Sequence, residues 1–255
     1  MAGWMRAAAV VAAIGLAGPA CAQKPEDTEQ AGPAPPVVTP AAQPGGPPSD
    51  AVVLFGGKDL SEWVSVKDKG PAGWGVEDGA LVVKLAAGNI ETKRAFGSYQ
   101  LHIEWKIPVG IAGSGQLRGN SGVFLASIGP GDAGYELQVL DSYQNTTYVN
   151  GQAGSIYKQS PPLANAMRPP GEWQVYDVVW TAPTFGPDGK VKTPAKVTAF
   201  HNGVLVQNDY VLAGPTRFIG KAEYGAAHGR APIKLQAHAG GGPVSFRNIW
   251  VRPLD

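Results

Sequence analysis

Two short stretches of alternating sequence hold the side chains best suited to chemistry. In the first, Glu136 and Gln138 alternate with apolar residues, and in the second, Gln236 and His238 do the same. Successive side chains of a β-strand point to opposite faces, so each stretch offers one apolar face and one polar face. A carboxylate and an imidazole can transfer protons, and amides can hold polar ligands. We therefore expect a site where these two polar faces meet.

A third stretch, residues 101–107, alternates in the same way and places Glu104 on its polar side. If all three stretches lie in one sheet, Glu104 joins Glu136 and His238 on a common wet surface. Glu104 could instead form an ordinary cross-strand charge pair with Lys106. The sequence leaves both interpretations of Glu104 open.

The elements that must position these residues are short strands. No window of helical length keeps a 3.6-residue period, and many of the 35 glycines and 23 prolines fall between short apolar runs. Asp78-Gly79 and Asn202-Gly203 are typical hairpin turns. The pattern predicts an all-β chain, folded as a two-sheet antiparallel sandwich or jelly roll. The predicted strands are residues 51–55, 74–83 as a hairpin, 99–107, 121–126, 135–140, 173–181, 195–201, 203–206, 232–238 and 244–252.

Charge and cysteine content narrow the class of protein. The 21 basic and 20 acidic residues nearly cancel, so there is no global positive field to attract nucleic acid. Cys21 is the single cysteine, and it lies near the N-terminus. A mature chain without it has no disulfide, so its stability must come from a large core. No stretch of that chain is apolar enough to cross a membrane, and we expect no nucleic-acid partner.

The first 22 residues have the features of a secretory signal peptide. Arg6 supplies a short positive region, residues 7–16 are apolar, and Ala20-Cys21-Ala22 fits a small-residue cleavage pattern. The apolar run is shorter than the roughly 20 residues of a membrane span. Two interpretations remain open, a cleaved signal or a lipoprotein acylated on Cys21. Either one predicts an exported protein, periplasmic or extracellular.

Residues 23–50 contain eight prolines and few large apolar side chains. Such a composition favours an extended, disordered linker. A single domain is predicted for residues 51–255. Within it, residues 145–171 and 212–231 are long for plain connections, and long loops on a rigid scaffold often carry binding groups.

An ordered series of motifs spans this predicted domain. The motifs are residues 54–63 (LFGGKDLSEW), 74–79 (WGVEDG), 96–105 (FGSYQLHIEW), 120–123 (NSGV), 134–141 (GYELQVLD), 154–157 (GSIY), 171–173 (GEW), 202–204 (NGV), 235–238 (LQAH) and 246–249 (FRNI). Together they resemble the 3-keto-disaccharide hydrolase domain family. This resemblance implies a concanavalin-like jelly roll that acts on glycosides carrying a ketone at C3 of the sugar.

The implied chemistry assigns roles to individual residues. A C3 ketone acidifies the proton on C2, so a base can remove it, the group at C1 then leaves, and added water completes a net hydrolysis. His238 is the candidate base or else a metal ligand, and Glu136 the candidate acid or second base. The remaining candidates would bind substrate hydroxyls or the enolate oxygen, with Tyr157 stacking or donating a proton: Glu104, Asn120, Gln138, Tyr157, Lys158 and Gln236.

Three alternatives remain open on the sequence. A divalent metal could stabilise the enolate, with Glu104, Glu136 and His238 as candidate ligands. A conventional acid–base glycosidase would need two carboxylates across a cleft, and Glu104 with Glu136 is the pair to compare. A non-catalytic carbohydrate-binding module could use the same scaffold, because this fold class hosts lectins as readily as hydrolases.

Overall fold

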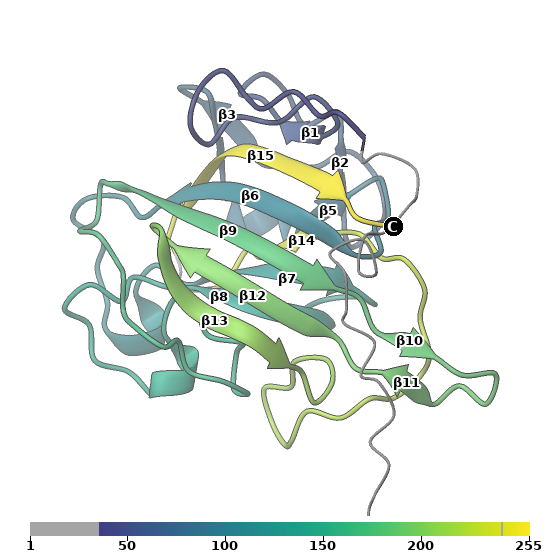
Figure 1. Ribbon diagram of the computed structural model, residues 1–255. Coiled ribbons are helices and arrows are strands. Elements are labelled where there is room, and N and C mark those ends of the chain that lie inside the picture. Colours follow the sequence, from purple (N-terminus) through teal and green to yellow (C-terminus); the bar gives the residue numbers. More distant parts are fainter. Residues whose placement is uncertain (1–35, 241) are drawn as a thin grey trace, which may run out of the picture. The chain divides into compact units, whose positions relative to one another are not determined.

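The computed structural model describes residues 36–240 and 242–255, and residues Val38–Asp255 form one compact unit. The fold is an antiparallel β-sandwich, as the sequence predicts (Figure 1). The predicted signal peptide, Cys21 and residues 23–35 of the predicted linker lie outside the described residues. Among the residues that are described, no helix is long and apolar enough to span a membrane.

The larger sheet has eight strands. Seven follow the order β13-β12-β9-β6-β15-β4-β3, and the eighth, β1, lies off this path and pairs with β15. Its strands are β1 (Val52–Phe55), β3 (Gly75–Glu77), β4 (Ala80–Val82), β6 (Tyr99–Lys106), β9 (Trp173–Thr181), β12 (Lys196–His201), β13 (Val204–Val211) and β15 (Ser245–Pro253).

The smaller sheet has five strands in the order β2-β5-β14-β7-β8, and part of it lies behind β6, β9 and β12 in Figure 1. Its strands are β2 (Trp63–Ser65), β5 (Ile90–Thr92), β7 (Ser121–Ser127), β8 (Gly134–Val139) and β14 (Lys234–Leu235). A separate ribbon pairs β10 (Thr184–Phe185) with β11 (Val191–Thr193), and three short 3-10 turns complete the described elements: η2 (Leu85–Ala87), η3 (Gly115–Leu117) and η4 (Val149–Gly151).

The two sheets enclose one hydrophobic core. Trp63, Trp105 and Trp180 are almost fully buried in it and fill much of its volume. Two tyrosine hydroxyls cross from the larger sheet to the smaller one. Tyr99 donates to the carbonyl of Leu125 at 2.6 Å, and Tyr176 donates to the carbonyl of Gln138 at 2.7 Å. These bonds satisfy the buried hydroxyls and join the layer that carries the site to the layer that supports it.

Both predicted hairpin turns are present. Asp78 and Gly79 have φ values of 49° and 75°, and Asn202 and Gly203 have φ values of 52° and 82°. Consecutive residues with positive φ form the turn whose twist matches that of paired strands, and these residue types tolerate that region.

The strand predicted over residues 232–238 is much shorter in the structure. Only Lys234 and Leu235 form ladder pairs, in β14. The amide of Gln236 still donates to the carbonyl of Gly122, but the amide of Ala237 donates to the Asn89 side chain instead of a strand. The chain therefore leaves the sheet just before His238.

The ordered unit also starts before the predicted domain boundary at residue 51. The carbonyl of Gly45 accepts hydrogen bonds from the side chains of Asn248 and Trp250, at 2.8 and 2.9 Å, and Asp50 pairs with Arg252 at 2.7 Å. The prediction of a disordered linker is therefore wrong for residues 38–50, because side chains of β15 bind this segment and Thr39 and Ser49 bond to each other within it.

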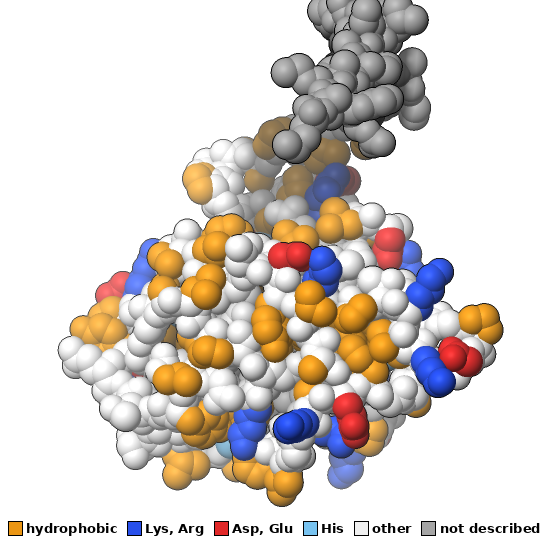
Figure 2. Space-filling view, turned by 60° about the horizontal axis from the view of Figure 1, so that its bottom comes forward, with side chains coloured by type: hydrophobic (Ala, Val, Ile, Leu, Met, Phe, Trp, Pro, Cys, Tyr) orange, Lys and Arg blue, Asp and Glu red, His pale blue; other side chains and the backbone are white. Residues whose placement is uncertain are grey.

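Basic and acidic side chains are interspersed among hydrophobic ones on the face shown in Figure 2. Exposed ion pairs on the surface include Lys196 with Asp209 at 2.8 Å and Arg230 with Asp255 at 3.0 Å. Acidic and basic side chains therefore offset each other locally at these pairs, as they nearly do in the chain as a whole.

Candidate functional site

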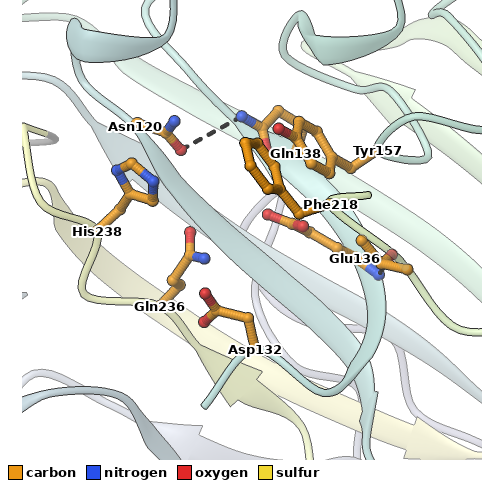
Figure 3. A pocket seen from close by; sticks show the side chains of 9 residues that line it. Asn120, Asp132, Glu136, Gln138, Tyr157, Phe218, Gln236 and His238 are labelled. Carbon is orange, nitrogen blue, oxygen red and sulfur yellow. Dashed lines mark hydrogen bonds between the residues drawn. The ribbon is translucent and has the colours of Figure 1, made fainter. Parts of the chain in front are cut away.

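A cavity of about 350 Å³ lies against the polar outer face of the five-stranded sheet (Figure 3). Its volume is within the roughly 300–1,000 Å³ range of small-molecule sites. Strands β7, β8 and the segment after β14 form its floor, and loops supply the remaining wall. The lining residues are Asn120, Asp132, Glu136, Gln138, Tyr157, Thr216, Phe218, Gln236 and His238.

The structure brings together six of the eight predicted site residues. They meet because β7 lies between β8 and β14. Polar residues of β8 and of the segment that follows β14 therefore face the same space. Gly122 of β7 is opposite Gln138 on one side and accepts the Gln236 amide on the other. The six residues are Asn120, Glu136, Gln138, Tyr157, Gln236 and His238.

Gly122 makes room for the carboxyl group of Glu136. A Cβ atom at position 122 would lie 2.5 Å from Oε1 of Glu136, closer than real contacts allow. The glycine is therefore part of the site, because it lets the Glu136 side chain lie across β7 towards the centre of the cavity.

Glu136 is 4 % exposed, and its carboxyl is set up to hold a proton. Burial, followed by the nearby charge of Asp132, raises its pKa to about 8, and the opposing charge of Lys234 does not offset these two causes. At neutral pH the protonated form therefore predominates, and Glu136 can donate a proton inside the cavity.

An amide network fixes Gln138 and Asn120. Nε2 of Gln138 donates to Oδ1 of Asn120 at 3.3 Å and to Oε1 of Gln116 at 3.2 Å, and Asn120 donates to the Gln116 carbonyl at 2.9 Å. This network uses the donor side of the Gln138 amide and leaves its oxygen free.

Three buried polar atoms of the lining residues have no partner within the part of the chain that the structure describes. They are Oε1 of Gln138, Oε1 of Gln236 and Nδ1 of His238. Buried polar atoms in native proteins are nearly always hydrogen-bonded, so a cluster of three in one cavity favours a polar ligand. The two amide oxygens require donors, which the hydroxyl groups of a sugar would supply.

Tyr157 forms one wall of the cavity, and its hydroxyl lies 2.6 Å from the hydroxyl of Tyr148. Burial raises the pKa of Tyr157 above its ordinary value, so the phenol keeps its proton and can donate a hydrogen bond. Lys158 does not line the cavity. Its Nζ donates to the Phe218 carbonyl at 2.9 Å and lies 4.5 Å from the centre of the Phe218 ring, so it holds a wall residue in place.

The prediction that Glu104 shares this surface is wrong. Glu104 lies on β6 of the larger sheet, where it faces away from the core and pairs with Arg247 at 2.6 Å. Glu104 and Glu136 therefore lie on opposite outer faces of the sandwich. Burial raises the pKa of Glu104, but hydrogen bonds from His102, Asn248 and Arg247 outweigh it and lower that pKa to about 2.

This placement also overturns two proposed residue sets. Glu104, Glu136 and His238 cannot hold one metal ion together, and Glu104 with Glu136 cannot flank one glycosidic bond. Within residues 36–240 and 242–255, no three His, Cys, Asp or Glu side chains are grouped closely enough to hold a metal. Alternation predicted the face of each strand correctly, but it carries no information on which sheet a strand joins.

Sequence reasoning missed three lining residues, Asp132, Thr216 and Phe218. Phe218 and Thr216 lie in residues 212–231, the long loop that was expected to carry binding groups without its members being singled out. Asp132 lies in the Gly- and Pro-containing loop between β7 and β8. Its place in the sequence could have indicated a role, because that loop joins two strands at the site.

Comparison with known proteins identifies the fold and the family. The family model for the 3-keto-alpha-glucoside-1,2-lyase-like domain matches residues 50–252. The chain belongs to this family. The resemblance found in the sequence motifs is thereby confirmed, and the whole cavity lies inside the matched domain. Membership of the 3-keto-alpha-glucoside-1,2-lyase-like family supports a carbohydrate-active protein.

Solved structures agree with this assignment. A protein named "putative glycosyl hydrolase" from Parabacteroides distasonis ATCC 8503 is 52 % identical, with a TM-score of 0.83 over 91 % of this chain and 97 % of that one. A second protein of the same name and organism is 23 % identical, with a TM-score of 0.56 over 81 % of this chain and 94 % of that one, and it shows the shared fold only. No curated protein matches the chain.

Proposed function

We propose that this protein is an exported enzyme that cleaves glycosides whose sugar carries a ketone at C3. The observation that carries this proposal is the shared cavity of Glu136 and His238. Glu136 is a buried carboxyl whose raised pKa keeps it protonated at neutral pH, and His238 presents a ring nitrogen without a hydrogen-bond partner. A proton donor and a proton acceptor in one site are what an elimination next to a ketone requires.

In the proposed reaction, a ring nitrogen of His238 takes the proton from C2, and the electron pair moves to the C3 oxygen as an enolate. The enolate then re-forms the ketone, C1 and C2 become doubly bonded, and the C1–O bond breaks. Glu136 gives its proton to the departing oxygen. In the second half, water adds across the double bond. His238 returns its proton to C2, and Glu136 recovers a proton from the water whose hydroxyl joins C1.

The other lining residues would hold the sugar and the developing charge. The phenol of Tyr157 and the amide of Gln236 can donate to oxygens of the sugar, including the enolate oxygen, whereas the Asn120 amide is held by Gln116. The free oxygens of Gln138 and Gln236 would accept from hydroxyl groups. Most of these groups are held by β7 and β8 or their network, so little reorganisation is needed when charge develops.

The test is incubation of the purified protein with a 3-keto-glucoside and, separately, with the unoxidised parent glucoside. We expect release of the group at C1 from the ketone alone. His238→Gln and Glu136→Gln should each lower kcat by a factor of about 10² or more while the variants still bind the sugar, in line with loss of acid–base catalysis. Parallel reactions with a chelator test the metal dependence. Equal cleavage of both glucosides would contradict the proposal.

A non-catalytic carbohydrate-binding module remains the second candidate. The observation in its favour is Phe218, a residue that is 70 % exposed at the wall of the cavity, because aromatic rings commonly stack on sugars. A binding module would retain the 3-keto-glucoside without turnover. In that case His238→Gln would weaken binding by a modest factor and leave no catalytic rate to lose.

A further inference from the structure

Lys234 is a fully buried lysine that the proposed reaction does not use. It lies on β14, two residues before Gln236, and it is 0 % exposed. Its Nζ donates to three backbone carbonyls, those of Gly129 at 3.1 Å, Gly131 at 2.9 Å and Ala133 at 2.8 Å. All three ammonium protons are thus committed to one loop, so the lysine is not available as a proton donor to a ligand.

That loop, residues 128–133 between β7 and β8, carries Asp132 to the cavity. It has a second tether in Asn89, whose Nδ2 donates to the Gly131 carbonyl at 3.0 Å and to Oδ1 of Asp132 at 2.9 Å. Oδ1 of Asn89 accepts from the amide of Ala237, next to His238. Lys234 and Asn89 therefore connect the loop to the segment that carries the histidine.

The loop contains few internal bonds that could hold this conformation. The amide of Ile128 donates to the Ala133 carbonyl at 3.2 Å, and the amide of Ala133 donates to the Pro130 carbonyl at 3.2 Å. Ile128 packs against the hydrophobic core at the start of the loop, but Gly131 and Asp132 are exposed to solvent, so apolar burial does not fix the part of the loop that reaches the cavity. Its three bonds to Lys234 are shorter than its own two, which makes the lysine the main tether.

Burying an ammonium group without an ion-paired carboxylate is costly, and it lowers the pKa of Lys234 to about 8. The charged groups around it are Glu91 on β5, Asp132 in the loop and Glu136 on β8, with Lys69 beside Glu91. The ring of Phe124 on β7 lies 5.1 Å from Nζ. A structural contact with one loop could be made by a neutral side chain, so the charge points to an influence on the carboxylates of the site.

We propose that Lys234 is a positioning residue that latches residues 128–133 over the cavity floor, so that Asp132 is held towards Glu136. Its effect on catalysis rests on the proposed function, whereas the latch itself is a property of the fold. The groups that face Glu136 are Asp132, Lys234, Tyr157 and His238.

The latch and a simple charge effect predict opposite changes in the pKa of Glu136. Among the causes of its shifted pKa, the raising effects of burial and of Asp132 are both larger than the lowering effect of Lys234. If Lys234→Met only removes a positive charge, the pKa of Glu136 rises. If it also frees the loop, Asp132 moves away and water enters, so the pKa falls.

The first experiment measures amide hydrogen exchange in wild type, in Lys234→Met and in the exposed control Lys192→Met. We expect exchange at Ile128 and Ala133 to be faster by roughly tenfold or more in Lys234→Met, because three hydrogen bonds to the loop are lost. Amides of β9 and β12 should stay unchanged, and Lys192→Met should match wild type throughout. Unchanged exchange of the loop in Lys234→Met would overturn the latch.

The second experiment follows the Glu136 carboxyl by carbon-13 NMR against pH in glutamate-labelled protein, with Glu136→Gln used to assign the resonance. The latch predicts a lower pKa for Glu136 in Lys234→Met than in wild type. An unchanged or higher pKa would overturn the proposal even if the loop exchanged faster.

The third experiment compares cleavage of the 3-keto-glucoside. The alkaline limb of kcat against pH, where Glu136 loses its proton, should move to lower pH in Lys234→Met, and a limb in the wild-type position would contradict positioning. An inactive wild type would refute the proposed function and leave the first two experiments intact as tests of the latch.

If Lys234→Met does not fold, Asn89→Ala removes the half-buried second tether. It should accelerate exchange at the same two amides, and no acceleration would contradict the latch.

Discussion

At the scale of single residues, the central fact is a carboxyl that the fold keeps neutral. Glu136 has no charged partner close enough to offset its burial, and Asp132 disfavours its ionisation further. Most buried carboxylates in proteins are paired, so an unpaired one is typical of a functional group. The same arrangement has a cost in stability that can be measured.

Glu136→Gln should stabilise the protein increasingly as pH rises. The folded-state pKa of about 8 lies above the reference value of 4.5, so the native state holds a proton that the unfolded chain releases between these values. The contribution of this proton to wild-type stability is therefore complete below pH 4.5 and is lost as pH rises through 8. The loss is on the order of a few kcal/mol. Glutamine mimics the neutral acid and removes this loss. Urea unfolding from pH 4 to 9 measures it, with the exposed Glu77→Gln as control. Parallel curves for wild type and Glu136→Gln would contradict the prediction.

Gly122→Ala tests the space reserved for the Glu136 carboxyl. The added Cβ would fall 2.5 Å from Oε1, so the carboxyl must move out of its position in the cavity. We expect the rate of sugar cleavage to fall by at least tenfold. The free energy of unfolding should fall by only about 1–3 kcal/mol, the range for an overpacked site. The matched control is Gly225→Ala, because a Cβ there meets nothing within 4 Å. Full activity in Gly122→Ala would show that the carboxyl position is not needed.

At the scale of elements, the sequence predicted which face of each strand is polar more reliably than which strands are neighbours. The alternation around Glu136 is present as predicted, and His238 reaches the same cavity although the chain leaves the sheet just before it. The same pattern around Glu104 belongs to the other sheet, because pairing depends on register and long-range packing that a local period does not encode. The cavity wall was still less predictable. Asp132 and Phe218 are ordinary residues in irregular loops, and tethers such as Lys234 hold them from elements distant in sequence.

Tyr176→Phe tests the connection between the two sheets. Its hydroxyl donates to the Gln138 carbonyl, on the strand that carries Glu136. Removing it should lower the free energy of unfolding by about 1 kcal/mol, because the carbonyl keeps a second donor in the amide of Gly154. Urea denaturation measures the change, and Tyr210→Phe, at a half-buried tyrosine, is the control. Equal stability of Tyr176→Phe and wild type would mean that this bond does not hold the layers together.

At the scale of the whole domain, titrating groups are divided between its two outer faces and its core. Glu136 lies in the cavity of one sheet, and His102 and Glu104 lie on the outer face of the other. His102 contacts the segment of residues 38–50 through Gly45, where an added Cβ would be 3.2 Å from its ring. His201 is in the core, stacked 5.5 Å from Trp105. Each group responds to pH for a different structural reason, so their effects combine into one stability profile.

The profile should reach its maximum at mildly acidic pH, near 5 to 6. Burial lowers the pKa of His201 to about 3, so its contribution is lost as pH falls from 6.5 towards 3. Burial opposes charge on His102, but its bonds to Asp177 and Glu104 raise its pKa to about 9. That contribution is complete below pH 6.5 and is lost as pH rises through 9. The loss at Glu136 begins at lower pH still, so the alkaline side should decline first and further. Urea unfolding at constant ionic strength across pH 3 to 10 gives the profile. A maximum at pH 8 or above would mean that the native state does not hold the Glu136 and His102 protons that its geometry implies.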